Sequence, residues 1–101
     1  MIFIFTTFPN KAQAVKIGKT LLDKKLAVCW NLFPVDSNYR WKDKIVKDKE
    51  LLMIIKTKDS NFSKIESFIQ KNHSYEVPEI VAVKAEKVSK PYLKWLMEEL
   101  A

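Results

Sequence analysis

Apolar residues recur along the chain with two different spacings, and these divide it into predicted strands and helices. Residues 2–8 are β-branched or aromatic throughout and stop at Pro9, so we predict a central strand that is covered on both faces. From residue 11 to about residue 24 the apolar positions follow a helical period, with Asn10 as the expected N-cap. Gly18 lies on the apolar stripe of this helix, where we expect close packing against the sheet.

Two long extended stretches follow, over residues 27–41 and 44–57, and Lys42 and Asp43 form the predicted turn between them. A stretch of this length spans roughly 50 Å, whereas a globule of about 100 residues is only about 35 Å across. The tip of the hairpin must therefore project beyond the core of its own chain. It carries four apolar side chains that favour aggregation when exposed, so we expect another subunit to cover them. These side chains are Tyr39, Trp41, Ile45 and Val46.

The helical period returns in a segment that Asp59 or Ser60 can cap and that runs to about His73. Residues 80–88 are again a β-type run, and Pro91 opens a short C-terminal helix. The order strand, helix, strand, strand, helix, strand is that of the ferredoxin-like split βαβ fold. We therefore predict an α+β sandwich with an antiparallel sheet, two helices on one face, an extended β-hairpin and a C-terminal helix.

Composition limits the classes of function. The 101 residues fit a single domain, residues 1–101, and one glycine excludes the P-loop and the dinucleotide-binding fingerprint. One cysteine excludes an intrachain disulfide and fits a reducing compartment, so we expect a cytoplasmic location. Apolar runs stay well short of the roughly 20 residues that cross a bilayer, so we expect no membrane partner. The net charge of +6 comes from dispersed lysines, which favours a solvated surface over nucleic-acid binding.

Residues 73–80 contain the densest group of polar side chains. His73 with Glu76 or Glu79, joined by Cys29 from the second strand, offers nitrogen, oxygen and sulfur ligands suited to copper or zinc. A structural hydrogen-bond network is the alternative interpretation. Because the chain has one histidine, we favour the network unless neighbouring subunits bring further ligands to the same place.

Catalytic arrangements have little support in the sequence. Cys29 and His73 could form a nucleophile and base pair, but Cys29 lies in an apolar run without a glycine turn for an oxyanion hole. Glu76 and Glu79 are a weak acid and base pair, since Pro78 prevents the regular helix that would fix their separation. We expect no enzyme activity.

Lys56 and Thr57 end the long strand, and we expect them beside Thr6 and Thr7 at the end of the first strand. Hydroxyls and a cation in that place could hold an anion or a metabolite carboxylate. The alternative is that these residues only cap strands, which the strand propensity of threonine favours.

The chain resembles the CutA divalent-ion tolerance family over essentially its whole length. The most specific segment, residues 73–80, reads His-Ser-Tyr-Glu-Val-Pro-Glu-Ile and is similar to the family's His-Pro-Tyr-Glu-x-Pro-Glu-Ile. The supporting segments are Cys29-Trp30-Asn31, Tyr39-Arg40-Trp41, Ile55-Lys56-Thr57 and residues 92–96. The resemblance implies a ferredoxin-like fold, a tight homotrimer with long hairpins extending between subunits, and a link to tolerance of copper and other divalent ions.

Three positions depart from the family pattern. Ser74 replaces the usual proline, Asp43 stands where the hairpin often has glycine, and Thr6 stands where some members have cysteine. The last change removes a soft ligand, which leaves His73 as the best remaining ligand for copper.

We therefore expect a non-enzymatic homotrimer that weakly binds copper or another divalent metal ion and has no obligatory cofactor. Its expected metal ligands are His73, Glu76 and Cys29. The alternative is a PII-like trimeric sensor that binds a small anionic metabolite in clefts between subunits, an idea that rests on fold analogy. The expected lining of such a cleft is Lys56, Thr57, Tyr75 and Glu79.

Overall fold

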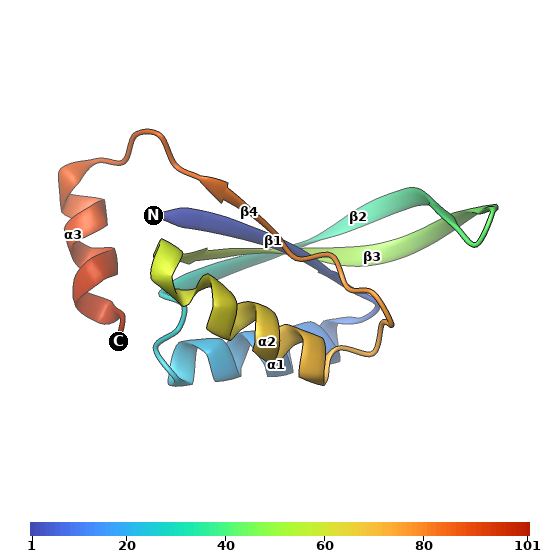
Figure 1. The fold of residues 1–101 in the computed structure, drawn as a ribbon, viewed down its shortest axis with the longest axis horizontal. Coiled ribbons are helices and arrows are strands. Elements are labelled where there is room, and N and C mark those ends of the chain that lie inside the picture. Colours follow the sequence, from blue (N-terminus) through green and yellow to red (C-terminus); the bar gives the residue numbers. More distant parts are fainter.

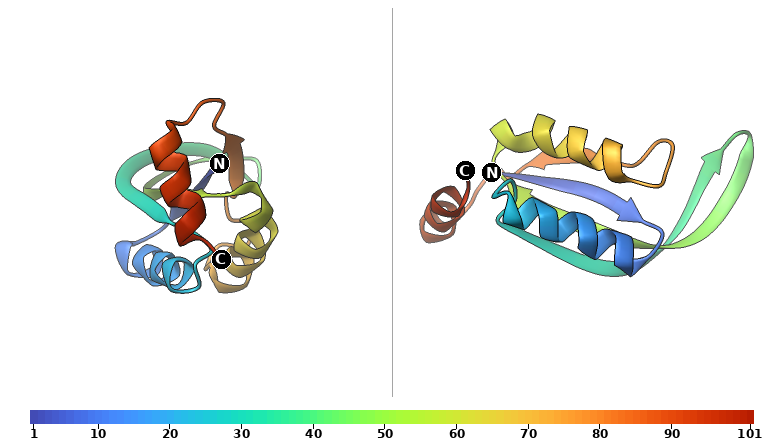
Figure 2. Two further views of the ribbon diagram at one scale, coloured as in Figure 1. Left: turned by 90° about the vertical axis from the view of Figure 1, so that its left-hand side faces the viewer. Right: turned by 90° about the horizontal axis from the view of Figure 1, so that it is seen from below.

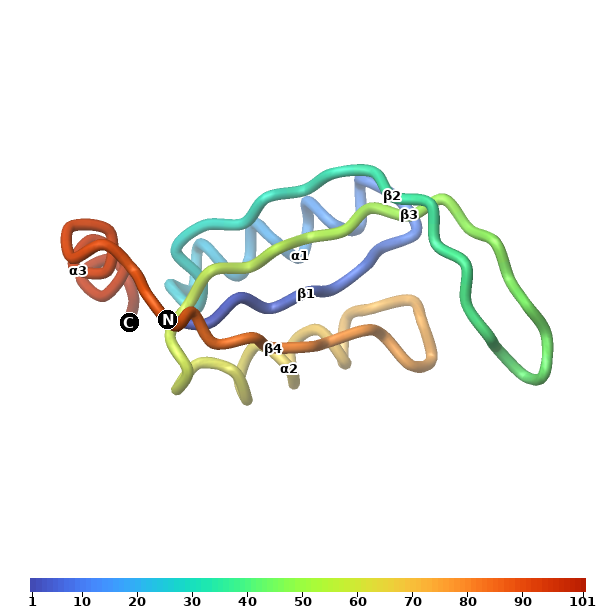
Figure 3. The backbone as a smooth tube through the Cα atoms, turned by 90° about the horizontal axis from the view of Figure 1, so that it is seen from above, coloured from blue at the N-terminus to red at the C-terminus, as the bar shows by residue number.

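The computed structural model describes residues 1–101, and its elements follow the predicted order. They are β1 (Ile2–Phe8), α1 (Lys11–Asp23), β2 (Cys29–Trp41), β3 (Lys44–Thr57), a 3₁₀ turn (Asp59–Asn61), α2 (Phe62–Asn72), β4 (Val81–Lys84) and α3 (Lys90–Glu99). The four strands form one antiparallel sheet in the order β2-β3-β1-β4 (Figure 3). Helices α1 and α2 lie together on one face of this sheet (Figure 1). The predicted ferredoxin-like sandwich is confirmed.

The hydrophobic core lies between the sheet and the two helices. Alternate residues of β1, among them Ile4 and Phe8, are fully buried there against Ile17 of α1 and Ile65 of α2. Gly18 packs as expected, because a Cβ atom at this position would lie 2.6 Å from Nε1 of the Trp30 indole. The bare backbone of α1 therefore lets the ring of a β2 residue enter the helix–sheet interface.

The opposite face of the sheet has no cover within the chain (Figure 2). Phe3 and Phe5 of β1 are paired with Val83 and Val81 of β4, so their side chains share this face. The two valines are 49% and 51% exposed. Our prediction that the first strand is covered on both faces is therefore wrong for a single chain. An apolar run reveals that both faces avoid water, but it does not reveal what covers each one.

The β2–β3 hairpin projects beyond the sheet (Figure 1). Strand β1 pairs with β3 only as far as Phe8 with Leu51, so residues 35–50 form a two-stranded ribbon. It ends at the predicted turn, where Lys42 and Asp43 have φ values of 49° and 62°. The molecule measures 45 × 26 × 21 Å, and the ribbon lies along its longest dimension. The predicted projecting tip is confirmed.

Several element boundaries differ from the sequence prediction, and strand β2 begins at Cys29 instead of residue 27. Strand β4 stops at Lys84 instead of residue 88, because its partner β1 begins opposite it at Ile2 and offers no further residues. The second helix takes no side-chain cap from Asp59 or Ser60. Those residues form the 3₁₀ turn, and Asn61 turns inward to donate a hydrogen bond to the Leu26 carbonyl at 3.1 Å. The Asn10 cap is confirmed by its 2.9 Å bond from the Gln13 amide.

Helix α3 lies at the end of the sheet away from the ribbon tip, beside both chain termini (Figure 1). Leu96 is fully buried, whereas Trp95 and Met97 are exposed. None of the helices is long and apolar enough to pass through a membrane.

Candidate functional site

His73 fixes the loop between α2 and β4 to the end of β1. Its Nε2 lies 2.7 Å from the Thr7 carbonyl oxygen, and its Nδ1 accepts a hydrogen bond from the Tyr75 amide at 3.0 Å. The ring therefore carries its proton on Nε2 and donates it to Thr7. It also stacks on Phe8, with ring centroids 4.8 Å apart. Both ring nitrogens thus serve backbone groups, and a metal ion can bind His73 only by displacing one of these bonds.

Ser74 provides a second attachment for the same loop. Its hydroxyl accepts a hydrogen bond from Nε2 of Gln13 at 3.0 Å, and its amide donates to Oε1 of Gln13 at 3.3 Å. The serine that replaces the usual proline therefore ties the loop to the first turn of α1.

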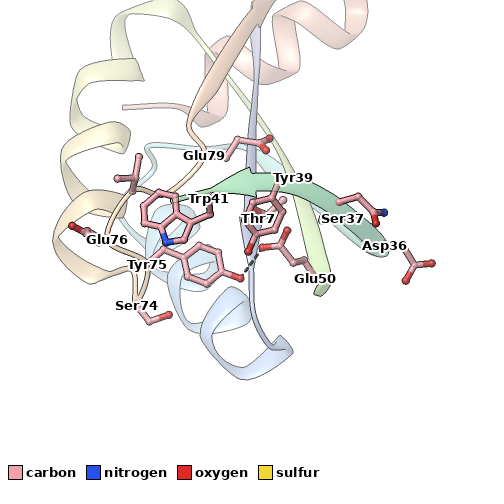
Figure 4. A pocket seen from close by; sticks show the side chains of 12 residues that line it. Thr7, Asp36, Ser37, Tyr39, Trp41, Glu50, Ser74, Tyr75, Glu76 and Glu79 are labelled. Carbon is pink, nitrogen blue, oxygen red and sulfur yellow. Dashed lines mark hydrogen bonds between the residues drawn. The ribbon is translucent and has the colours of Figure 1, made fainter. Parts of the chain in front are cut away.

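The loop places Tyr75 over the start of the ribbon. Its hydroxyl donates a hydrogen bond to Oε2 of Glu50 at 2.6 Å (Figure 4). Glu50 is only 8% exposed, although it is a carboxylate on a strand. Burial, followed by the hydrogen bond to Glu50, raises the pKa of the Tyr75 phenol, which keeps it protonated as a donor.

A second phenol and carboxylate pair lies on the ribbon. The hydroxyl of Tyr39 donates a hydrogen bond to Asp48 across the two strands. This bond is the main cause that raises the pKa of Tyr39 to about 12. Both phenols therefore remain neutral far above physiological pH, and the two carboxylates keep their donors.

A cleft of about 770 Å³ lies between the ribbon and the loop (Figure 4). Its lining contains three aromatic rings and four carboxylates but no lysine, arginine or histidine, in a chain of net charge +6. The rings belong to Tyr39, Trp41 and Tyr75, and the carboxylates to Asp36, Glu50, Glu76 and Glu79. The cleft is therefore a local site for positive charge on a basic protein.

The structure brings only part of the predicted metal site together. Glu76 lines the cleft, and His73 holds the loop that forms its wall. Cys29 instead pairs with Lys56, which lies opposite Phe3 at the other end of the sheet. Phe3 is four residues from Thr7, so Cys29 and Lys56 lie roughly 13 Å from Thr7 along the direction of β1. The chain contains no group of three or more histidine, cysteine or acidic residues that could hold one metal ion.

The predicted anion site is not assembled. Lys56 and Thr57 pair with Phe3 and Ile2, so they lie beside the start of β1 and not beside Thr6 and Thr7. Our expectation was wrong because antiparallel pairing sets the end of β3 against the beginning of β1. Thr57 is fully buried, and its hydroxyl donates to the Leu26 carbonyl at 2.6 Å. The capping interpretation of Thr57 is the one that the structure supports.

Tyr75 and Glu79, the other two residues of that predicted set, line the acidic cleft at the opposite end of the sheet. Two of the four carboxylates of this cleft, Asp36 and Glu50, were not predicted from the sequence, and Thr7 was expected at a different site. Glu50 could have been found as the one acid next to the apolar run of residues 51–55, at the point where the ribbon leaves the sheet. Nothing in the sequence marks Thr7 apart from Thr6.

Comparisons with known proteins agree along the full chain. The model of the CutA1 divalent ion tolerance protein family matches residues 2–99. The divalent-cation tolerance protein CutA of Thermotoga maritima is 41% identical over 100 residues, which are 99% of each chain.

Two solved structures have the same fold. A variant of CutA1 from Pyrococcus horikoshii superposes with a TM-score of 0.97 at 40% identity, covering 100% of this chain and 99% of its own. The protein described as the periplasmic divalent cation tolerance protein CutA of Archaeoglobus fulgidus has a TM-score of 0.95 at 39% identity, with 98% of each chain covered.

Proposed function

The chain belongs to the CutA1 divalent ion tolerance family, and we propose that it weakly binds copper or a similar divalent cation as part of the tolerance of such ions, without catalysing a reaction. One observation of the structure carries this proposal. Four carboxylates line the cleft with no cationic side chain among them, although cations outnumber acids in the chain by 18 to 12. Carboxylate oxygens that are not gathered around one point suit weak and exchangeable binding of divalent ions.

The carboxylates are the direct ligands in this proposal. Glu76 is our first candidate, because it lines the cleft and makes no hydrogen bond or ion pair within the chain. His73 acts mainly by holding the loop, and it becomes a ligand when an ion displaces the Tyr75 amide from Nδ1. Cys29 would join such a site only from another copy of the chain, since its own β2 carries it to the far end of the sheet.

We also propose that three copies assemble. The open face of the sheet is apolar, and the ribbon tip exposes Trp41 and Ile45, the latter by 70%. Both surfaces need cover that one chain does not provide.

Cytoplasmic location is likewise a proposal and is supported by the single free Cys29, whereas the Archaeoglobus fulgidus relative is described as periplasmic.

The sensor of an anionic metabolite is not favoured. The cleft has an acidic lining, which repels anions, and Lys56 lies at the opposite end of the sheet. Divalent cations are the better match to the charge of this cleft.

Isothermal titration of the chain with Cu²⁺ and with Zn²⁺ tests the proposal. We expect the double substitution Glu76→Gln and Glu79→Gln to remove most of the binding heat, because it halves the number of carboxylates in the lining. Asp23→Asn is the matched control, since Asp23 is an exposed acid on α1 outside the cleft. An isotherm that the double substitution leaves unchanged would contradict the proposed site.

A further inference from the structure

Most of the positive charge of the chain lies on the helices. Residues 11–25, which are α1 and the two residues after it, contain five lysines and a single acid, Asp23, and so supply four of the six net positive charges. Helices α1 and α2 cover the face of the sheet that is opposite the open face (Figure 2). Burial of the open face in an assembly therefore leaves this positive charge in contact with solvent.

The two helices run antiparallel and side by side (Figure 2). Gln13, at the start of α1, is hydrogen-bonded to Ser74, just after the end of α2. At the other end of α1, Nζ of Lys24 lies over the Phe68 ring of α2, 5.0 Å from its centroid. The side of α1 that carries Gln13 and Lys24 therefore faces α2. Lys16 shares this side, because it lies one helical turn after Gln13 and two turns before Lys24.

Two lysines of α2 lie along the same line. Lys64 and Lys71 are one turn before and one turn after Phe68, so they are on the side of α2 that faces α1. Antiparallel packing places Lys71 beside Lys16, and Lys64 beside Lys24. All four lysines are exposed. We call this row, which follows the line where the two helices meet, the lysine seam.

No acid of the chain pairs with the lysine seam. The two ion pairs of the structure lie on the ribbon and on α3. Of the two acids on these helices, Glu66 is two residues from Phe68 and therefore on the other side of α2. Asp23 lies four residues after Lys19, an exposed lysine outside the seam that offsets its charge. The four ammonium groups thus form a region of positive potential that an anion can neutralise.

The residue types and the spacing of the seam select the kind of anion. Lysines are point charges that bind phosphate, and the seam has no arginine for bidentate contacts to bases. Its one aromatic ring, Phe68, is partly buried and has Lys24 over its face, so it offers no platform for a base. Lys16 and Lys24 are eight residues apart, or about 12 Å along α1. A single phosphate group reaches one pair of lysines, whereas a linear chain of phosphates reaches both pairs.

We propose that the lysine seam binds inorganic polyphosphate, with the phosphate chain lying along the line between α1 and α2. Lys16 and Lys71 hold one part of the chain, and Lys24 and Lys64 hold the next. This inference goes beyond the proposed function and does not depend on it, because the seam and the acidic cleft are separate surfaces that share no residue.

Isothermal titration with long-chain inorganic polyphosphate, in a buffer free of divalent ions, tests the inference. We expect the double substitution Lys16→Gln and Lys71→Gln to weaken binding about tenfold and to lower the slope of log K against log salt by about two, because two phosphate contacts are lost. Lys87→Gln with Lys90→Gln is the matched control, since it removes the same charge from exposed residues beside the start of α3. We expect this control to bind almost as tightly as the wild-type chain.

Other anions complete the test. Orthophosphate is expected to give no measurable heat, and a single-stranded oligonucleotide with as many phosphates is expected to bind more weakly than polyphosphate. Equal weakening by the two double substitutions would show attraction to net charge alone and would overturn the seam as the site. Equal binding of the oligonucleotide, or of vesicles of anionic lipid, would overturn polyphosphate as its ligand. Absence of polyphosphate binding by the wild-type chain would overturn the inference and leave the proposed cation binding in place.

Discussion

Thr6 and Thr7 are chemically identical neighbours with different environments. Strand alternation turns Thr6 toward the helices and Thr7 toward the cleft. Thr6 is fully buried, and its hydroxyl has no hydrogen-bond partner. Thr57 is equally buried but bonds to the Leu26 carbonyl and accepts from Asn61. The same hydroxyl group therefore stabilises the fold at one position and destabilises it at the other.

Substitution of these two buried threonines by valine tests this difference. We expect Thr6→Val to raise the free energy of unfolding by about 1 kcal/mol, because it removes an unpaired polar atom from the core. Thr57→Val is expected to lower it by about 1–3 kcal/mol, since it leaves the groups that Thr57 bonds without their partner. Denaturant unfolding followed by circular dichroism measures both. Equal losses of stability in the two variants would show that Thr6 has a partner after all.

Element types could be predicted from periodicity, while boundaries and the cleft depended on contacts between distant segments. The 3.6-residue period of α1 and its Asn10 cap are local signals, and both were confirmed. The predicted end of β4 was wrong, because it depends on where its partner strand β1 begins. The loop of residues 73–79 could be found from its polar density. The position of Glu50 beside the apolar run of residues 51–55 could also be found, but its burial could not, since that arises only when Tyr75 folds over the ribbon.

Helix α1 and strand β2 are in tight contact where Gly18 faces the Trp30 indole. We expect Gly18→Ala to lower the free energy of unfolding by about 1–2 kcal/mol, although alanine favours helix, because its methyl group collides with the Trp30 indole. In a Trp30→Phe background the smaller ring leaves room, and the same substitution is expected to cost much less. Lys19→Ala, on the exposed side of α1, is the control. An equal cost in both backgrounds would show that the indole does not set the limit.

At the scale of the whole molecule, the sheet has one face covered by helices and one apolar face without cover. Phe5 and Ile54 are directly paired at the centre of the open face. From the sequence we predicted a contact between subunits at the ribbon tip alone, because the strand pattern did not show which face the helices cover. The structure adds the larger sheet face to the surfaces that self-association would bury.

The mass of the particle in solution tests the proposed assembly. Light scattering is expected to give three times 11.9 kDa for the wild-type chain. Ile54→Lys is expected to reduce this to the mass of one chain, because burying an unpaired ammonium group costs several kcal/mol, whereas the face is open in a single chain. Leu22→Lys, an exposed residue of α1, should keep the full mass. A wild-type particle of 11.9 kDa would contradict the trimer. If the Ile54→Lys variant stays trimeric and an Ile45→Lys variant dissociates, the contact between subunits lies at the ribbon tip and not at the sheet face.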